Sequence, residues 1–202
     1  MKRYDCMKAL APLLKDELVI LSLGASVDEW YNAAPHMREA SLFQQQLGCV
    51  TPEAFGLAVG LPHRRIVSLD TDGGLLFNLG ILATLANEQP QNLFVVVWDN
   101  KKYLSAGGHR THTEKGVVDL AAMARGAGIE DAYSATSLEE FEAHCRAGLT
   151  ATRPYLVVAH VEGAETLDLK RKPSDGREDK YVFVRHVEQS EGVLIMGPSE
   201  KN

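Results

Sequence analysis

Four short and almost uninterrupted apolar segments constrain the fold of this chain more than any other feature of its sequence. They span residues 18–23, 66–69, 93–98 and 155–159. Each is rich in β-branched residues and does not alternate with polar positions, which is typical of strands that are covered on both faces. Helical patterns lie between them. Strands that alternate with helices predict an α/β fold with a doubly wound, mostly parallel sheet and helices on both faces.

The expected helices span 75–87, 117–125 and about 52–61, and another begins at Ser137. The segment 75–87 is apolar almost all round, so we expect it to be well buried. Ser137 and Glu140 have the spacing of a capping box, and Pro52 suits a helix start.

Length and composition fit a single domain over residues 1–202. With 45% hydrophobic and 24% charged residues, the chain has the composition of an ordinary globular protein. We expect a core over about 1–160, followed by a polar loop and a C-terminal extension over 161–202. Apolar residues return at 180–196, which either close the domain or contact a partner.

Net charge and targeting signals narrow the class of protein further. The formal net charge is -6 and no basic stripe is present, so we expect no nucleic-acid partner. No signal peptide is recognisable and no segment is long enough to span a bilayer, so we expect no membrane partner. The three cysteines form no C-x-x-C pair, which fits a cytoplasmic location.

The stretch 69–100 carries the chemistry that we expect of the chain. A strand is followed by Asp72-Gly73-Gly74 and an apolar helix, and the next strand is followed by Asn100. Ligands of open parallel sheets bind beyond the carboxyl ends of the strands, so Asp72 and Asn100 are expected to meet there. Their oxygens suit Mg²⁺, while the glycines and the helix start suit an anion. The residues predict a site for a magnesium-bound diphosphate.

The segment 72–100, DGGLLFNLGILATLANEQPQNLFVVVWDN, resembles the G-D-G…N motif of thiamine diphosphate-dependent enzymes. The chain length and the segment 107–111 (GGHRT) are similar to the beta subunit of sulfopyruvate decarboxylases and to the C-terminal part of phosphonopyruvate decarboxylases. The resemblance to this family extends over roughly residues 1–160 of the chain. It implies the thiamine diphosphate-binding fold, with thiamine diphosphate and Mg²⁺ as cofactors.

The resemblance also implies roles for individual residues. Asp72 and Asn100 would bind Mg²⁺, with the backbone oxygen of Lys102 as the third protein ligand. Gly73 and Gly74 would line the diphosphate.

Further cofactor contacts are implied on three other segments. Gly48-Cys49-Val50 resembles the loop under the thiazolium ring, with Val50 as the apolar wedge that bends the cofactor. Gly24 and Ala25 match a position near the pyrimidine ring or the substrate. Tyr103, just after the metal-site residues, either packs in the protein or contacts a ligand.

The chain departs from the family pattern at three positions. Thr71 stands where the family has the first Gly of G-D-G, Gly74 where it has Ser, and His109 where it has Gln. His109 lies near the expected entrance of the active site and is a candidate substrate contact. Two other interpretations stay open for His109: ordinary loop surface, or a zinc site with His112 and Glu114, although no cysteine lies nearby.

Nothing in the sequence resembles the pyrimidine-binding domain, whose glutamate activates the cofactor in these enzymes. The resemblance therefore implies a separate alpha subunit, in a hetero-oligomer such as α2β2 or larger. The predicted function is the beta subunit of a 2-oxoacid decarboxylase, a carbon–carbon lyase. Its substrate would be a small 2-oxoacid with a second anionic group, such as a sulfonate or phosphonate. The alternatives are a subunit of another thiamine enzyme, such as an acyloin or acetolactate synthase, and a non-catalytic or regulatory subunit, which Thr71 keeps open.

Overall fold

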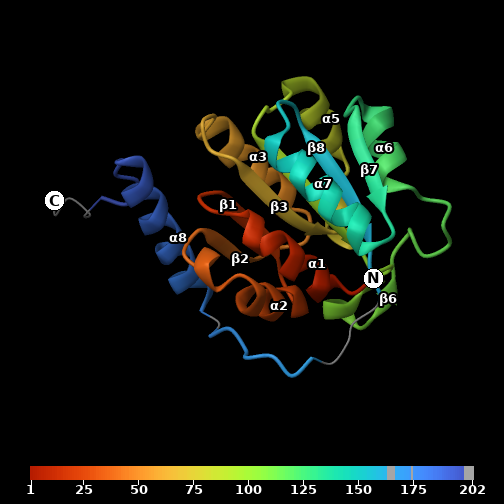
Figure 1. Cartoon of the computed structure of the whole chain (residues 1–202), viewed down its shortest axis with the longest axis horizontal. Coiled ribbons are helices and arrows are strands. Elements are labelled where there is room, and N and C mark those ends of the chain that lie inside the picture. The colour runs from red at the N-terminus through yellow and green to blue at the C-terminus, as the bar shows by residue number, and fades with distance from the viewer. Residues whose placement is uncertain (163–166, 174, 198–202) are drawn as a thin grey trace.

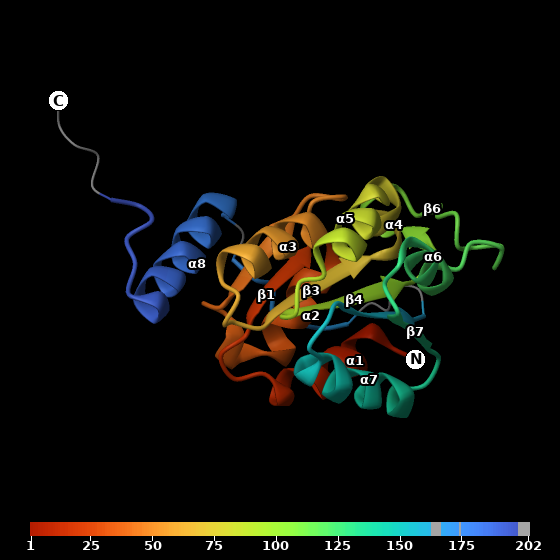
Figure 2. The same ribbon diagram turned by 90° about the horizontal axis from the view of Figure 1, so that it is seen from above.

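A six-stranded parallel sheet lies between two layers of helices in the computed structural model (Figures 1 and 2). The structure describes residues 1–162, 167–173 and 175–197. The strand order is β2-β1-β3-β4-β8-β7. The strands are β1 (Leu18–Ser22), β2 (Ser41–Gln45), β3 (Ile66–Thr71), β4 (Leu93–Asp99), β7 (Asp131–Ala135) and β8 (Tyr155–His160). The four apolar segments form β1, β3, β4 and β8, so the predicted doubly wound α/β fold is confirmed.

The helices divide between the two faces of the sheet, as Figure 2 shows. One face carries α3 (Val50–Gly60), α4 (Asp72–Phe77), α5 (Gly80–Glu88) and α6 (Leu120–Ala127). The other carries α1 (Arg3–Leu10), α2 (Ala25–Ala33) and α7 (Leu138–Thr150). The core fills both interfaces, and every residue of β1 and β4 is buried because helices cover both faces. The predicted capping box at Ser137 is confirmed at the start of α7.

The apolar segment 75–87 forms two helices, α4 and α5, and not the single helix that its periodicity predicts. Asn78 ends α4 with non-helical dihedral angles, and its side-chain amide donates to the carbonyl oxygen of Gly48 at 3.1 Å. Phe77 is 65% exposed, so the prediction that the whole segment is well buried was wrong. The helix predicted over 117–125 also has different bounds: α6 begins at Leu120 because the Asp119 side chain caps it.

The edge strands β2 and β7 and the helices α1 and α2 had no prediction. β7 is half exposed, so it lacks the continuous apolar character of the central strands. In α2, Trp30 is fully buried and its indole N–H donates to the hydroxyl of Ser41 in β2 at 3.0 Å. Trp30 is therefore a core residue that joins α2 to the edge of the sheet.

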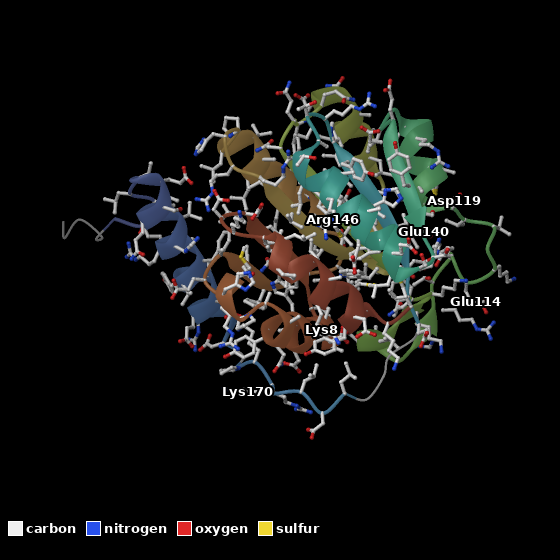
Figure 3. All side chains as sticks on the ribbon, in the orientation of Figure 1. Lys8, Glu114, Asp119, Glu140, Arg146 and Lys170 are labelled. Carbon is white, nitrogen blue, oxygen red and sulfur yellow. The ribbon has the colours of Figure 1, made fainter. Side chains whose placement is uncertain are left out.

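The C-terminal segment returns along α2 and ends in α8 (Gly176–Glu191), which lies beside β2 (Figure 1). In Figure 3, Lys170 marks this return, where its carbonyl oxygen accepts a hydrogen bond from Asn32 of α2 at 2.7 Å. The helix begins inside the segment that we expected to be a loop. Phe183 and Val187 are buried against the domain. Within the ranges described, the structure has no helix with the length and apolarity that a membrane span requires.

The described strands also include a two-stranded antiparallel sheet, β5 (Lys102–Tyr103) paired with β6 (His109–Arg110). A short 3₁₀ turn, Leu104–Ala106, connects them. This hairpin follows the carboxyl end of β4 directly, so it lies against the predicted site.

Candidate functional site

A cavity opens at the carboxyl ends of β1, β3 and β4. The chain passes from β1 to β2 on one side and then to β3 on the other, so the direction of winding reverses between β1 and β3. Open α/β sheets bind ligands at such a switch point. Five of the predicted site residues line this cavity: Ala25, Gly73, Asn100, Lys102 and Tyr103. The fold thus brings together residues from three strand ends.

Asp72 is fully buried at the first position of α4, directly after β3. Its Oδ2 accepts a hydrogen bond from the hydroxyl of Thr111 at 2.6 Å and lies 3.3 Å from the hydroxyl oxygen of Thr113. Its Oδ1 is buried without a hydrogen-bond partner among the described residues. A buried, unpaired carboxylate oxygen is costly, and a cation would compensate it.

The electrostatics of Asp72 agree with this interpretation. Burial raises the pKa of Asp72 to about 6, and the neighbouring Asp99 carboxylate also raises it. A divalent cation would favour the ionised form and reverse this shift. Without a cation, therefore, this carboxyl group takes up a proton at a higher pH than an ordinary aspartate does.

A tight turn after β4 shapes the second half of the predicted metal site. Asn100 is 8% exposed, and its Oδ1 accepts a hydrogen bond from the backbone N–H of Lys102 at 3.0 Å. Lys101 has a φ of 62°, which is uncommon for a residue other than glycine. Its carbonyl oxygen accepts from the backbone N–H of Thr111 at 3.0 Å. Thr111 therefore contacts both the Asp72 carboxylate and the Asn100 turn.

A second hydrogen-bond network supports the first. Thr113 donates to Asp99 Oδ1 at 2.7 Å, and the His160 ring Nδ1 lies 2.9 Å from Asp99 Oδ2. Burial alone would raise the pKa of Asp99, but the hydrogen bonds with His160 and Thr113 outweigh it and the pKa lies below its usual range. Thr113 and His160 were not predicted, because their segments meet β4 only in the folded chain. Thr111 was visible only as part of the GGHRT segment.

A sequence profile of the C-terminal thiamine pyrophosphate-binding domain of thiamine pyrophosphate enzymes matches residues 25–159. The chain belongs to the thiamine pyrophosphate enzyme family. Thiamine pyrophosphate is another name for thiamine diphosphate, so the predicted cofactor and fold agree with the family. The match begins after β1, at the first residue of α2, ends one residue before the end of β8 and includes every predicted metal ligand.

Individual relatives share the same domain. The chain is 35% identical over 129 residues to the sulfopyruvate decarboxylase subunit beta of Methanothermobacter thermautotrophicus, which covers 64% of this chain and 68% of that protein. The corresponding subunit of Methanocaldococcus jannaschii is 31% identical over 159 residues, with 78% and 82% covered. The phosphonopyruvate decarboxylase of Streptomyces viridochromogenes is 32% identical over 150 residues, with 74% and 37% covered.

A solved structure supports the fold independently. The X-ray structure of a "putative thiamin diphosphate-dependent enzyme" from Mycobacterium smegmatis superposes with a TM-score of 0.69 at 21% identity. The superposition covers 81% of this chain and 32% of that one. The chain therefore spans about a third of the larger single-chain relatives and most of the separate beta subunits.

The residues of the site fit the family's Mg²⁺-bound diphosphate. Asp72 supplies an unpartnered buried oxygen and Asn100 an amide oxygen, and both are hard ligands that suit Mg²⁺. Lys102 as a third ligand, through its backbone oxygen, stays a prediction. No three His, Cys, Asp or Glu side chains gather into a metal site within the part of the chain that the structure describes.

Two glycines let the β5–β6 hairpin close over the cavity of this thiamine pyrophosphate enzyme. A Cβ on Gly73 would lie 2.3 Å from the ring of Tyr103, and a Cβ on Gly24 would lie 2.3 Å from the hydroxyl of Ser105. Gly24 also has a φ of 92°, which favours glycine. Gly24 and Gly73 are therefore required for close packing at the cavity wall.

Thr71 and Gly74 have structural roles that explain two departures from the family pattern. Thr71 has extended dihedral angles, and its hydroxyl accepts from the backbone N–H of Gly74 at 2.9 Å, which caps α4. A Cβ on Gly74 would lie 2.1 Å from Asp70 Oδ1. The buried Asp70 accepts from Thr51 at 2.7 Å, and burial raises its pKa to about 6. A diphosphate contact through the Gly74 N–H stays a prediction, since that N–H already has an acceptor.

The predicted thiazolium loop lies next to the cavity. Gly48 has a φ of 84°, Cys49 is half-buried and Val50 is fully buried in the core at the start of α3. Leu47, which was not predicted, lines the cavity. The roles of Gly48, Cys49 and Val50 toward the cofactor stay predictions.

His109 is exposed on β6, directly opposite Tyr103. Glu114 pairs with Arg110 at 3.0 Å on the loop that leads to α6, which Figure 3 shows projecting from the domain. His112 instead borders an apolar groove formed with Phe77 and Val118. The contact of His109 with a substrate stays a prediction.

Proposed function

We propose that the chain is the beta subunit of a heteromeric thiamine diphosphate-dependent 2-oxoacid decarboxylase. The observation that carries the proposal is the buried, unpartnered Oδ1 of Asp72 beside the Asn100 turn, at the switch point of the sheet. The names of its relatives support a substrate with a second anionic group, such as sulfopyruvate or phosphonopyruvate.

Each residue of this half-site has a defined task. Asp72, Asn100 and the backbone oxygen of Lys102 hold Mg²⁺, and Thr111 orients the Asp72 carboxylate. The bound cofactor supplies the electron sink for decarboxylation. The turn that begins at Tyr103 restricts the access of water to the metal side of the cavity.

An apolar groove beside the cavity supports the existence of a partner subunit. It is lined by Leu76, Phe77, Leu79, Tyr103, Val118 and Met123, together with His112. Phe77 is 65% and Met123 39% exposed, and exposed apolar patches next to a site mark interaction surfaces. The described residues that line the cavity include no glutamate. The partner therefore covers the groove and supplies the glutamate that activates the cofactor.

Equilibrium binding of thiamine diphosphate to the assembled complex, with and without Mg²⁺, tests this function. We expect Mg²⁺-dependent binding and release of CO₂ from a 2-oxoacid that carries a sulfonate or phosphonate. Absence of binding in the complex, with or without Mg²⁺, would favour the non-catalytic alternative. Binding without decarboxylation of any such acid would favour another thiamine enzyme.

A further inference from the structure

Arg3, the first residue of α1, lies in the wall of the same cavity. It lines the cavity together with Gly73 and Asn100, and its side chain is only 10% exposed. The family match begins at residue 25, so Arg3 lies outside the matched domain. A buried cation beside the metal-site residues needs a physical explanation, because burying a charge is costly unless it is paired.

Glu29 of α2 pairs with Arg3 and fixes the plane of its guanidinium group. Arg3 Nε donates to Glu29 Oε2 at 2.7 Å, and Nη2 donates to Oε1 at 2.8 Å. The Glu29 side chain is 8% exposed. In the contacts of the described residues, Nη1 has no acceptor. The guanidinium stays protonated in proteins, so its Nη1 hydrogens remain available to another acceptor.

The composition of the cavity wall favours an anion as that acceptor. The described lining residues include two basic residues, Arg3 and Lys102, and no acidic one. A buried ion pair by itself contributes little net stability, since the desolvation of both charges offsets their attraction. Glu29 therefore keeps the guanidinium oriented, while one edge of the guanidinium stays open to the cavity.

We infer that Arg3 binds a tetrahedral oxyanion in this cavity and that Glu29 positions it. This inference rests on the proposed function. The oxyanion is either the terminal phosphate of the cofactor or the sulfonate or phosphonate group of the substrate. All three groups present acceptor oxygens in a geometry that a planar guanidinium recognises, often with two parallel hydrogen bonds.

The test compares Arg3→Met with Glu29→Gln in the full chain, purified with the subunit that accompanies it. Arg3→Met removes the cation, whereas Glu29→Gln keeps the cation and retains an acceptor for it. A double variant, Arg3→Met with Glu29→Met, avoids an unpaired buried carboxylate if the single variant fails to fold. Binding of Mg²⁺-pyrophosphate and Mg²⁺-thiamine diphosphate is measured by calorimetry. KM is then measured for sulfopyruvate and for pyruvate at saturating cofactor.

The two sources of the oxyanion give different results. If the ligand is the phosphate, Arg3→Met or the double variant weakens Mg²⁺-pyrophosphate binding by roughly tenfold to a hundredfold, the loss expected for a charge-assisted hydrogen bond. If the ligand is the substrate, pyrophosphate binding is unchanged and the preference for sulfopyruvate over pyruvate falls by a similar factor. In both cases Glu29→Gln keeps or tightens anion binding.

Two results would overturn the inference. Equal losses of anion binding in Arg3→Met and Glu29→Gln would assign the pair a purely structural role. Unchanged pyrophosphate binding and unchanged substrate preference in the Arg3 variants would show that Arg3 binds no anion. If the wild-type complex itself binds neither pyrophosphate nor cofactor, the proposed function fails and this inference with it.

Discussion

The two sides of the cavity differ in how completely this chain builds them. On the side of the predicted metal ligands, Asp72 and Asn100 are buried and accept hydrogen bonds from Thr111 and the Lys102 backbone. Beside it, the groove around Phe77 and Met123 is apolar and exposed. The site at Asp72 and Asn100 is already arranged for a charged ligand before the ligand binds. The groove, in contrast, excludes water only when another protein surface covers it. The difference predicts that metal binding and assembly with a partner depend on separate residues of this chain.

The largest effect is expected from Asp72→Asn. This change removes the charge of the predicted metal ligand, so Mg²⁺-dependent thiamine diphosphate binding should weaken by roughly a hundredfold or more. The unfolding temperature without cofactor should stay the same or rise, because a buried carboxylate with an unpartnered oxygen is removed. Calorimetry and thermal unfolding measure the two quantities.

Asp131→Asn serves as the control, because Asp131 is the first residue of the edge strand β7 and does not line the cavity. It should leave cofactor binding unchanged. If Asp72→Asn bound the cofactor as tightly as the wild type, the metal role of Asp72 would be refuted.

The groove offers the second test of the comparison. Phe77→Ser combined with Met123→Lys should weaken association with the partner by roughly tenfold to a hundredfold, as loss of exposed anchor residues at an interface does. Binding of Mg²⁺-pyrophosphate should stay near the wild-type value, since both residues line the groove and neither lines the cavity. Val59→Ser, at an apolar residue that is 60% exposed on α3, is the control. Assembly that is equally tight in all variants would contradict the assignment of the groove.

The pH dependence of metal binding should follow Asp72. Burial raises its pKa to about 6, so below pH 6 a proton competes with Mg²⁺ and binding should weaken by about tenfold per pH unit. The stability of the folded chain without Mg²⁺ should depend on pH in the opposite direction, because it falls as the pH rises. The folded chain without Mg²⁺ holds this proton more tightly than the unfolded chain does, so stability is greatest below the ordinary carboxyl pKa and is lost as pH rises through about 6. Calorimetry measures the Mg²⁺ affinity and denaturant titration measures the free energy of unfolding, each between about pH 4 and 8, the range over which this pKa shift acts. A Mg²⁺ affinity that does not depend on pH would contradict the account.

The smallest effect is expected from Thr71→Ala. Loss of the cap on α4 should lower the free energy of unfolding by about 1 kcal/mol. Cofactor binding should change little, because the predicted metal ligands keep their contacts. Ser137→Ala, which removes the cap of α7 far from the site, should have a similar effect on stability. A large loss of cofactor binding in Thr71→Ala alone would show that the Thr71 hydroxyl contacts the ligand.

The sequence predicts the central fold well because buried strands have a distinctive composition. It misses β2 and β7, whose edge positions tolerate polar residues such as Gln45 and Ser134. It also predicts one helix over 75–87, because periodicity does not reveal that the Asn78 amide bonds to the distant Gly48 carbonyl. The exposure of Phe77 has a related cause: an exposed apolar residue looks like a core residue when only hydropathy is read.

The site, too, contains residues that the sequence predicts and residues that it does not. The placement of Asp72 and Asn100 at one sheet edge follows from strand topology and could be predicted. The contacts of Thr113, His160 and Arg3 could not, because each comes from a segment that meets the cavity only through tertiary packing. No local pattern marks such residues.

Affinity purification of the chain from its native cell, followed by mass spectrometry of the proteins that accompany it, tests the central claim most directly. The account predicts a stoichiometric partner subunit that resembles a pyrimidine-binding domain and carries a glutamate able to reach the cofactor. It also predicts that the Phe77→Ser, Met123→Lys variant loses this partner. Recovery of the chain only with copies of itself, with the groove variant behaving like the wild type, would contradict the account.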